Sequence, residues 1–243
     1  MKHILNSIST LPSTELSKND CKKELRNIKE EFFELQNKFY ADGRFSLLII
    51  LQGMDTSGKD GVIRNVFSCM NPMGLNVTSF KKPSGEELNH DFLWRVYPKF
   101  PAKRMIRVFN RSYYEDILVP MVNKTLKPND IQHRYQYINE LEDHLKRNNT
   151  HILKFFLHIS KDKQLERIDE RKTKPHKKWK YDIADEETRK DWDEYLNAYT
   201  SVIENCNKQP WHIIPSDKKW NRNYEVATIL LKHFKSLKLK YPN

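Results

Sequence analysis

Residues 45–61 read FSLLIILQGMDTSGKDG, and this stretch decides the fold. The segment Phe45 to Leu51 is apolar except for Ser46, as expected of a strand buried on both faces of a parallel sheet. The segment Gly53 to Gly61 follows it and holds three of the chain's six glycines. Glycine lets the backbone curl so that its N–H groups and the start of the next helix face one phosphate. The stretch predicts a P-loop between a buried strand and a helix.

The side chains of this loop indicate its chemistry. Lys59 supplies a mobile positive charge for a phosphate that is being transferred. The usual motif ends in Gly-Lys-Ser/Thr, with the hydroxyl on magnesium, but Asp60 follows Lys59 here. Asp55 is the expected ligand of Mg²⁺ instead, since a hard cation prefers carboxylate oxygen and takes few protein ligands beside substrate phosphates. The loop residues expected to contact phosphate are Gly53, Thr56, Ser57, Gly58, Lys59, Asp60 and Gly61. The alternative is an ordinary strand-to-helix turn that happens to contain Gly and Lys.

Strands and helices alternate along the rest of the chain, which predicts an α/β fold with a doubly wound parallel sheet. The further expected strands are Asn76–Phe80, Met105–Phe109, Ile152–Ile159 and, more weakly, Trp211–Ile214. The expected helices are Ser17–Tyr40, Lys59–Met70, Glu86–Tyr97, Tyr113–Val122, Ile131–Arg147, Gln164–Arg171, Glu186–Asn205 after a capping Asp185, and Tyr224–Leu237. A chain of 243 residues, 38% of them hydrophobic, can form one domain. We expect a single domain over 1–243, with an N-terminal helix over 17–42 and a basic lid over 167–185.

A second group of polar residues follows the strand Met105–Phe109, at the sheet edge where open α/β sheets bind ligands. Arg111 can contact phosphate oxygens through two N–H groups and stabilise charge in the transition state. Glu115 and Asp116 fall in the first turn of the next helix, where they can share magnesium or orient an acceptor. Asp116 is the second expected metal ligand after Asp55. The alternative is that both carboxylates only complement the helix dipole.

The basic lid carries seven Arg or Lys and two acids between Arg167 and Lys180. Pro175 should end the helix before it, leaving Thr173–Asp182 as a loop that closes over phosphates and excludes water. Trp179 is expected to anchor this loop on the core, with stacking on a nucleic-acid base as the alternative. For the segment as a whole, the alternative is a solvated charge run. The further residues expected to contact phosphate are Arg64, Lys81, Lys82, Arg167, Arg171, Lys174, Lys177 and Lys178.

Charge and cysteine usage limit the class of protein. A net charge of +11 favours polyanionic partners, but it does not choose among nucleic acid, an acidic membrane and a phosphate polymer. The longest apolar run, Leu47–Leu51, is far below the ~18 residues of a membrane span. Three widely spaced cysteines form no CxxC pair, which suggests neither disulfides nor a zinc site. We expect a cytoplasmic protein.

From about Asp42 to Lys232 the sequence resembles the family-2 polyphosphate kinases. The loop Gly53–Gly61 is similar to that family's variant Walker A motif, and Phe109–Asp116 is similar to its second motif. Arg171, Pro175, Trp179 and Asp185 are similar to its lid. Asn110 and Glu115 stand where many members have aspartate and asparagine, and this form resembles the third class of the family, which uses nucleoside mono- and diphosphates. The departure shifts the carboxylate role toward Glu115 and Asp116.

The resemblance implies a P-loop kinase fold related to thymidylate kinase, Mg²⁺ dependence and assembly into dimers or tetramers. It also implies reversible phosphoryl transfer from inorganic polyphosphate to AMP or ADP, which forms ADP or ATP. Two alternatives stay open, an ATP-dependent nucleoside monophosphate kinase of the thymidylate-kinase type and a basic nucleic-acid-binding protein. With a polyphosphate kinase we expect neither nucleic acid nor a membrane as partner.

Overall fold

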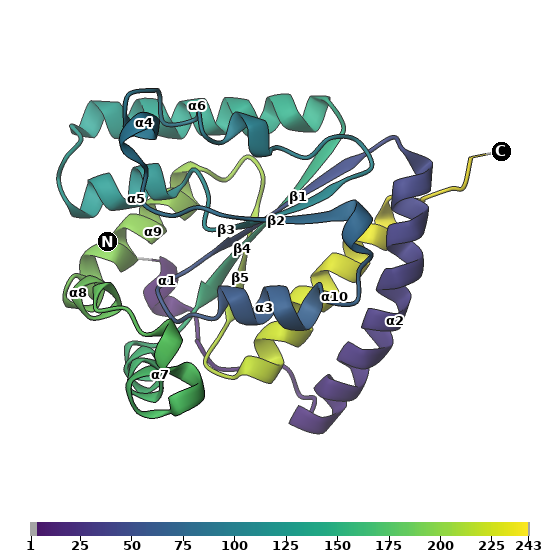
Figure 1. Ribbon diagram of the computed structural model, residues 1–243, viewed down its shortest axis with the longest axis horizontal. Coiled ribbons are helices and arrows are strands. Elements are labelled where there is room, and N and C mark those ends of the chain that lie inside the picture. The colour runs from purple at the N-terminus through teal and green to yellow at the C-terminus, as the bar shows by residue number, and fades with distance from the viewer. Residues whose placement is uncertain (1–3, 243) are drawn as a thin grey trace.

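Five parallel strands form the central sheet in this computed structural model, which describes residues 4–242 (Figure 1). Their order across the sheet is β2, β3, β1, β4, β5, and every neighbouring pair is parallel. The strands are β1 (Ser46–Gln52), β2 (Leu75–Ser79), β3 (Ile106–Asn110), β4 (Thr150–His158) and β5 (Trp211–Pro215). The expected parallel sheet is confirmed, including its weaker fifth strand.

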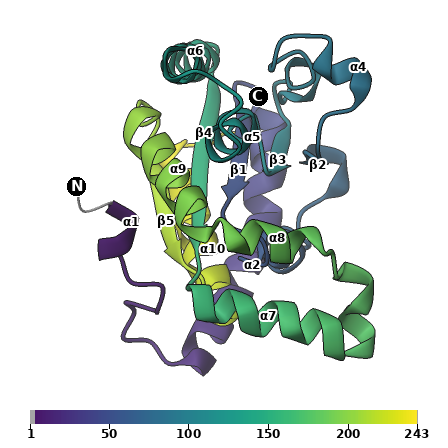
Figure 2. The ribbon, with the colours of Figure 1, turned by 90° about the vertical axis from the view of Figure 1, so that its left-hand side faces the viewer.

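Helices cover both faces of the sheet, as Figures 1 and 2 show. Helices α2, α3 and α10 lie on one face, and α5, α6 and α9 lie on the other. The helices are α1 (Ile4–Ser7), α2 (Lys18–Asp42), α3 (Lys59–Val66), α4 (Gly85–Leu88), α5 (Glu115–Val122), α6 (Pro128–Arg147), α7 (Lys161–Thr173), α8 (Ala184–Lys190), α9 (Trp192–Asn205) and α10 (Lys219–Ser236). Three short 3₁₀ helices are η1 (Pro72–Gly74), η2 (Tyr97–Lys99) and η3 (Pro175–Lys180). None of the helices within residues 4–242 combines the length and apolar character that crossing a bilayer requires.

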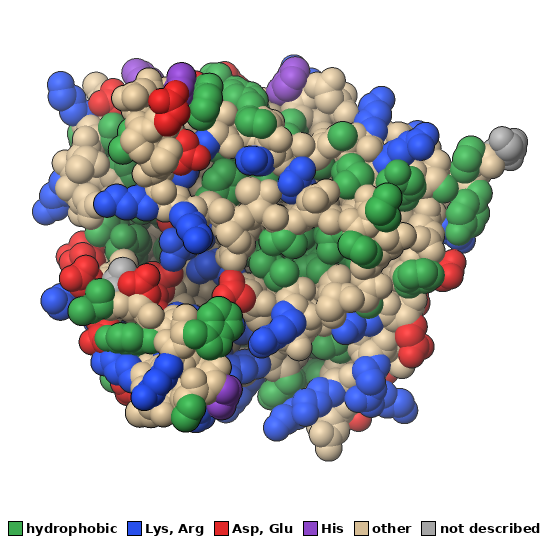
Figure 3. Space-filling view, in the orientation of Figure 1, with side chains coloured by type: hydrophobic (Ala, Val, Ile, Leu, Met, Phe, Trp, Pro, Cys, Tyr) green, Lys and Arg blue, Asp and Glu red, His purple; other side chains and the backbone are tan. Residues whose placement is uncertain are grey.

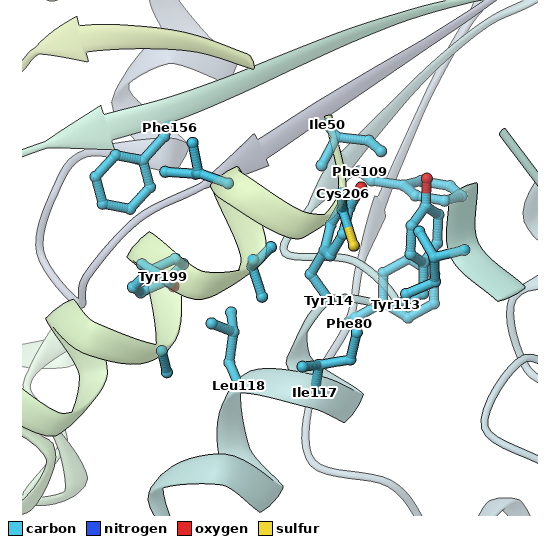
Figure 4. Close-up of a cluster of buried hydrophobic side chains, with 14 of the residues drawn as sticks. Ile50, Phe80, Phe109, Tyr113, Tyr114, Ile117, Leu118, Phe156, Tyr199 and Cys206 are labelled. Atoms are coloured by element: carbon cyan, nitrogen blue, oxygen red, sulfur yellow. The ribbon is translucent and has the colours of Figure 1, made fainter. Parts of the chain in front are cut away.

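Strand β1 holds the two halves of the core together. Its side chains alternate, so that Leu47 and Ile49 pack toward α2, α3 and α10 while Leu48 and Ile50 pack toward α5, α6 and α9. All four are fully buried, and each contributes about 1.5–3 kcal/mol relative to an exposed position. Figure 4 shows part of the core on the face covered by α5, α6 and α9, where Tyr114 and its neighbours pack between the sheet and α9. This burial fixes where β1 ends, and therefore where the P-loop begins.

Helix α2 corresponds to the N-terminal helix expected over 17–42. The hydroxyl of Ser17 caps it by accepting the backbone N–H of Asp20 at 3.2 Å. Gly43 ends it with a φ of 71°, a left-handed conformation that glycine adopts without strain.

The prediction of one helix over Glu86–Tyr97 is wrong. Only the short α4 forms, with a capping box between Ser84 and Glu87. The carboxylate of Asp91 then accepts the N–H of Leu93 at 2.9 Å and starts a turn. This local hydrogen bond competes with a continuous helix, so the segment continues as turns into η2.

Other helix boundaries also differ from expectation. The helix expected over Glu186–Asn205 is two helices, α8 and α9, with a break at Asp191. Asp185 does not cap a helix, because it lies inside α8 and binds Arg171. The helix starting at Lys59 ends at Val66, four residues before the expected Met70.

Candidate active site at the carboxyl edge of the sheet

The P-loop leaves the end of β1 and turns directly into α3. Gly53 has a φ of 145° and Gly58 a φ of 109°, conformations that other residues rarely adopt. A side chain at Gly53 would also lie 2.6 Å from the carbonyl oxygen of Leu157. The first N–H groups of α3 lack partners within the helix, and with its dipole they favour an anion at this end. The backbone of this loop can therefore bind a phosphate group through its N–H groups.

Lys59 lies buried over this loop. Its ammonium donates to the carbonyl of Gly53 at 2.7 Å and to that of Met54 at 3.2 Å. Burial lowers the pKa of Lys59, and the charge of Arg111 lowers it further, while Asp55 opposes both. A negative phosphate group would relieve the cost of holding this cation away from water.

Asp55 and Arg111 form an ion pair across the mouth of the loop. The second oxygen of Asp55 accepts the hydroxyl of Thr188 from α8 at 3.2 Å. Burial alone would raise the pKa of Asp55, but the charges of Lys59 and Arg111 outweigh it and lower that pKa. Asp55 is therefore an ionised carboxylate between two cations.

Arg111 is placed by an unusual backbone conformation. Its φ is 62°, a left-handed value uncommon outside glycine, and its N–H donates to the carbonyl of Leu51 at 3.1 Å. The turn directs the guanidinium back toward the P-loop, where Asp55 and Glu115 raise its pKa against the effect of burial. Strained conformations of this kind concentrate at functional sites.

Glu115 and Asp116 are adjacent in sequence but face different surroundings. Burial raises the pKa of Glu115, opposed by the charges of Arg111 and Lys59, so this carboxyl belongs to the P-loop cluster. Asp116 binds Arg95 at 3.1 Å, and burial raises its pKa too. The structure therefore favours Glu115 over Asp116 as the second carboxylate beside Asp55, and a metal role for Asp116 stays a prediction.

The expected basic lid is partly neutralised by its own acids. Arg171 binds Asp185 at 2.5 Å, and both Lys174 and Lys177 pair with Glu170. Hydrogen bonds from these two lysines lower the pKa of Glu170 to about 2. The acids of α7 and α8 lie among the cations, so the positive charge of this segment is partly balanced without a bound anion.

The shape of the lid also differs from expectation. Pro175 ends α7 as expected, but residues Pro175–Lys180 form the 3₁₀ helix η3 instead of an open loop. The expectation that Trp179 anchors the lid on the core is wrong, because the residue is 78% exposed, with the ammonium of Lys180 over its ring. Helices α7 and α8 lie side by side in Figure 2, and Lys172 binds Glu186 between them at 2.8 Å.

The remaining expected phosphate contacts fall into two groups. Arg167 is buried, and its guanidinium already donates hydrogen bonds to backbone carbonyls. The others are exposed, and Lys and Arg side chains are spread over the whole face drawn in Figure 3. These exposed residues are Arg64, Lys81, Lys82 and Lys178. Direct phosphate contact by any of the five stays a prediction.

Sequence reasoning missed two residues that complete the site. Thr188 reaches Asp55 from α8, across 133 positions of sequence. Arg222 reaches the carbonyl of Ser57 from α10, across 165 positions. No local pattern marks either residue, because only the tertiary fold brings α8 and α10 to the loop.

We expect Glu115→Gln to raise Tm at neutral pH by a few degrees while it lowers turnover. The raised pKa means that the folded chain holds the ionised carboxylate at a cost. Below the ordinary glutamate pKa of 4.5 the group is neutral in both folded and unfolded chains, so the gain should vanish there. Thermal unfolding between about pH 4 and pH 8 measures this. Glu140→Gln, at an exposed position of α6, is the control, and an equal Tm change in both variants would refute the expectation.

The family model, the relatives and the solved structure that match this chain all point to the same family. The family described as Polyphosphate kinase 2 (PPK2) matches residues 15–242. An AMP/ADP-polyphosphate phosphotransferase of Meiothermus ruber is 46% identical over 212 residues, which cover 86% of this chain and 79% of that protein. An ADP-polyphosphate phosphotransferase of Rhodopseudomonas palustris is 41% identical over 240 residues, 93% of this chain and 83% of that protein. The crystal structure of polyphosphate kinase 2 from Arthrobacter aurescens TC1 superposes with a TM-score of 0.96 at 38% identity, covering 98% of this chain and 87% of that one. This likeness confirms the P-loop kinase fold.

Proposed function

The chain belongs to the polyphosphate kinase 2 family, and we propose that it reversibly transfers a phosphoryl group from inorganic polyphosphate to AMP or ADP. The observation that carries this proposal is the convergence of Lys59, Arg111 and two carboxylates on the P-loop, in a chain matched by the family along almost its whole length.

The residues of the site account for catalysis by alignment and charge neutralisation. The N–H groups of the P-loop and of α3 bind the terminal phosphoryl group of the donor. Lys59 and Arg111 stabilise the charge that spreads over its oxygens during transfer. The phosphate oxygen of AMP or ADP that attacks is already an anion near neutral pH, so the reaction needs no general base. Helices α7 and α8, which contact the P-loop through Arg167 and Thr188, limit transfer to water when they cover the bound phosphates.

We propose Mg²⁺ as the cofactor, held by Asp55 and Glu115. Their oxygen donors suit a hard cation, and among residues 4–242 no group of three His, Cys, Asp or Glu is placed to hold a metal alone. Two carboxylates beside a phosphate site match the way Mg²⁺ is bound, with substrate oxygens and water completing its shell. When bound, the ion neutralises phosphate charge.

Asp55→Asn is expected to raise the Mg²⁺ concentration for half-maximal rate by about 10-fold or more, because an amide is a weaker ligand for a hard cation. The substitution also removes the ion pair with Arg111, so kcat at saturating Mg²⁺ should fall as well. Initial rates over a Mg²⁺ titration measure both effects. The control is Asp193→Asn, at an exposed position of α9. An unchanged Mg²⁺ dependence would remove Asp55 from the proposed metal site.

The relatives do not favour an ATP-dependent nucleoside monophosphate kinase. A donor comparison tests that alternative directly, with AMP as the acceptor and initial rates measured with ATP or polyphosphate as the donor. We expect polyphosphate to be used, whereas activity with ATP alone would support the alternative. Salt-sensitive DNA binding without nucleotide turnover would support a nucleic-acid-binding protein instead.

We further propose that the protein acts in the cytoplasm as a dimer or tetramer, with neither nucleic acid nor a membrane as partner. All three cysteines are free thiols, which suits a reducing compartment. Large apolar side chains are exposed along α2 and around β2, as expected of a surface that meets another subunit. Those side chains are Phe33, Tyr40, Met73 and Val77. Light scattering on the purified protein measures the oligomeric state, and a monomer at all concentrations would contradict it.

A further inference from the structure

Two buried arginines lie beneath the P-loop and converge on one carbonyl oxygen. Nη1 of Arg167, from α7, donates to the carbonyl of Ser57 at 3.0 Å and to that of Thr56 at 2.8 Å. Nη1 of Arg222, from α10, donates to the same Ser57 carbonyl at 3.2 Å. Nη2 of Arg167 also donates to the carbonyls of Ser216 and Asp217, at 2.6 and 3.1 Å. The two guanidinium groups thus join the loop to the segment that leads into α10.

The shared carbonyl sets the direction of the next N–H group. In a trans peptide the C=O and N–H point in opposite directions, and the described chain has no cis peptide bond. With the oxygen of Ser57 held toward the arginines, the N–H of Gly58 points away from them. This N–H precedes Lys59 and the start of α3, where the anion binds.

The glycines of the loop make room for Arg222 on its reverse side. A Cβ at Gly58 would lie 1.8 Å from Nη1 of Arg222, and one at Gly61 would lie 2.7 Å from Nη2. Gly58 also needs glycine for its φ of 109°, but Gly61 does not have a positive φ. At Gly61 the contact with Arg222 is therefore the structural reason for glycine.

Neither guanidinium forms an ion pair with a carboxylate within residues 4–242, although the charge of Asp217 acts on Arg167. The four acceptors of Arg167 are backbone carbonyls, and Arg222 donates to the Ser57 carbonyl and to the side-chain oxygen of Asn223 at 2.9 Å. Burial lowers the pKa of Arg222 to about 9, and the charge of Arg167 contributes. A buried cation without a counterion is costly, so an anion in the loop would offset part of that cost.

We propose that Arg222, with Arg167, is a positioning residue that holds the Ser57–Gly58 peptide in its anion-binding orientation, so that phosphate affinity depends on how α10 is docked. The proposal rests on the P-loop being the phosphate site of the proposed function. Arg222 acts through the backbone of the loop and does not touch the reacting phosphate.

The test uses tripolyphosphate as the probe, with its Kd measured by calorimetry on the full chain. Arg222→Met is expected to weaken binding by about 10-fold or more, since charged hydrogen bonds that orient the loop are lost. Its KM for polyphosphate should rise by more than its kcat falls. Arg222→Lys keeps the positive charge and can still donate one hydrogen bond to the loop, so it should recover part of the affinity for tripolyphosphate. Lys232→Met, at an exposed position of the same helix, is the matched control and should bind as the wild type does.

Gly61→Ala tests the same contact from the loop side, because the added methyl group meets Arg222 while the helical backbone accepts alanine. We expect it to weaken tripolyphosphate binding in the wild type but to have little further effect in the Arg222→Met background, where the obstruction is gone. This comparison stands even if Arg222→Met is less stable, provided that it is measured below its Tm.

The outcomes distinguish a failure of the positioning role of Arg222 from a failure of the proposed function. A Kd within about twofold of the wild type in folded Arg222→Met, or equal effects of Gly61→Ala in both backgrounds, would overturn the positioning role. Failure of the wild type to bind tripolyphosphate would instead contradict the proposed function. A lower Tm with unchanged Kd would show a purely structural role and also overturn the proposal.

Discussion

Replacing Lys59 with alanine is expected to lower kcat by about 10³-fold with polyphosphate and nucleotide both saturating. The ammonium of Lys59 is buried over the loop and electrostatically coupled to Asp55, Arg111 and Glu115. It can follow the phosphoryl group during transfer, whereas the backbone N–H groups are fixed. Its loss removes charge stabilisation in a site where water cannot substitute for it, which is why the expected effect is large.

Steady-state kinetics and a melting curve together test this expectation. Lys22→Ala, at an exposed position of α2, controls for the removal of a lysine charge far from the loop. The melting curve is needed because the ammonium also bonds the carbonyls of Gly53 and Met54. A folded Lys59→Ala variant that retains more than about a tenth of wild-type kcat would show that another group carries the charge.

Glu142→Ala is expected to destabilise the fold by about 3–5 kcal/mol, the cost of leaving one partner of a buried ion pair alone. Glu142 and Lys154 are fully buried and 2.8 Å apart. Glu142 also accepts the hydroxyls of Tyr113 at 2.8 Å and Tyr114 at 2.7 Å. Lys154 donates to the hydroxyl of Tyr114 and to the carbonyl of Cys206, and Figure 4 shows this tyrosine and cysteine side by side.

Urea unfolding of wild type and variant measures that free energy. Replacing both partners, as Glu142→Leu with Lys154→Met, should recover much of the stability, because no unpaired charge remains. A loss below about 1 kcal/mol in Glu142→Ala would mean that water or a rearranged side chain satisfies Lys154. Since Tyr113 and Tyr114 lie two and three residues after Arg111, the single variant should also lower activity at temperatures where it is folded.

The strands and the P-loop could be predicted because their signals are local. The unbroken apolar run of β1 and the glycines after it need no knowledge of the rest of the chain. The helix expected over Glu86–Tyr97 failed because apolar spacing does not reveal the turn at Asp91, where a side chain competes for the backbone. Helix α8 contacts α7 and the P-loop, which are distant in sequence, so the spacing of Glu186–Asn205 alone does not reveal that α8 and α9 are separate helices.

The candidate site was predictable where its residues follow the carboxyl ends of neighbouring parallel strands. Asp55, Lys59, Arg111 and Glu115 lie together because β1 and β3 are adjacent and end at the same edge. The environment of Asp116 was not predictable, since Arg95 comes from a segment whose structure was mispredicted. The backing of the loop by Arg222 depends on α10 and has no signal near the loop.

The most direct measurement follows nucleotide formation after the purified protein is mixed with Mg²⁺, inorganic polyphosphate and AMP, with no ATP present. Chromatography of the wild type should show ADP and then ATP appearing as polyphosphate is consumed, and both products should be nearly absent with Lys59→Ala. If the wild type formed neither ADP nor ATP from AMP and polyphosphate, phosphoryl transfer from polyphosphate at this P-loop would be contradicted.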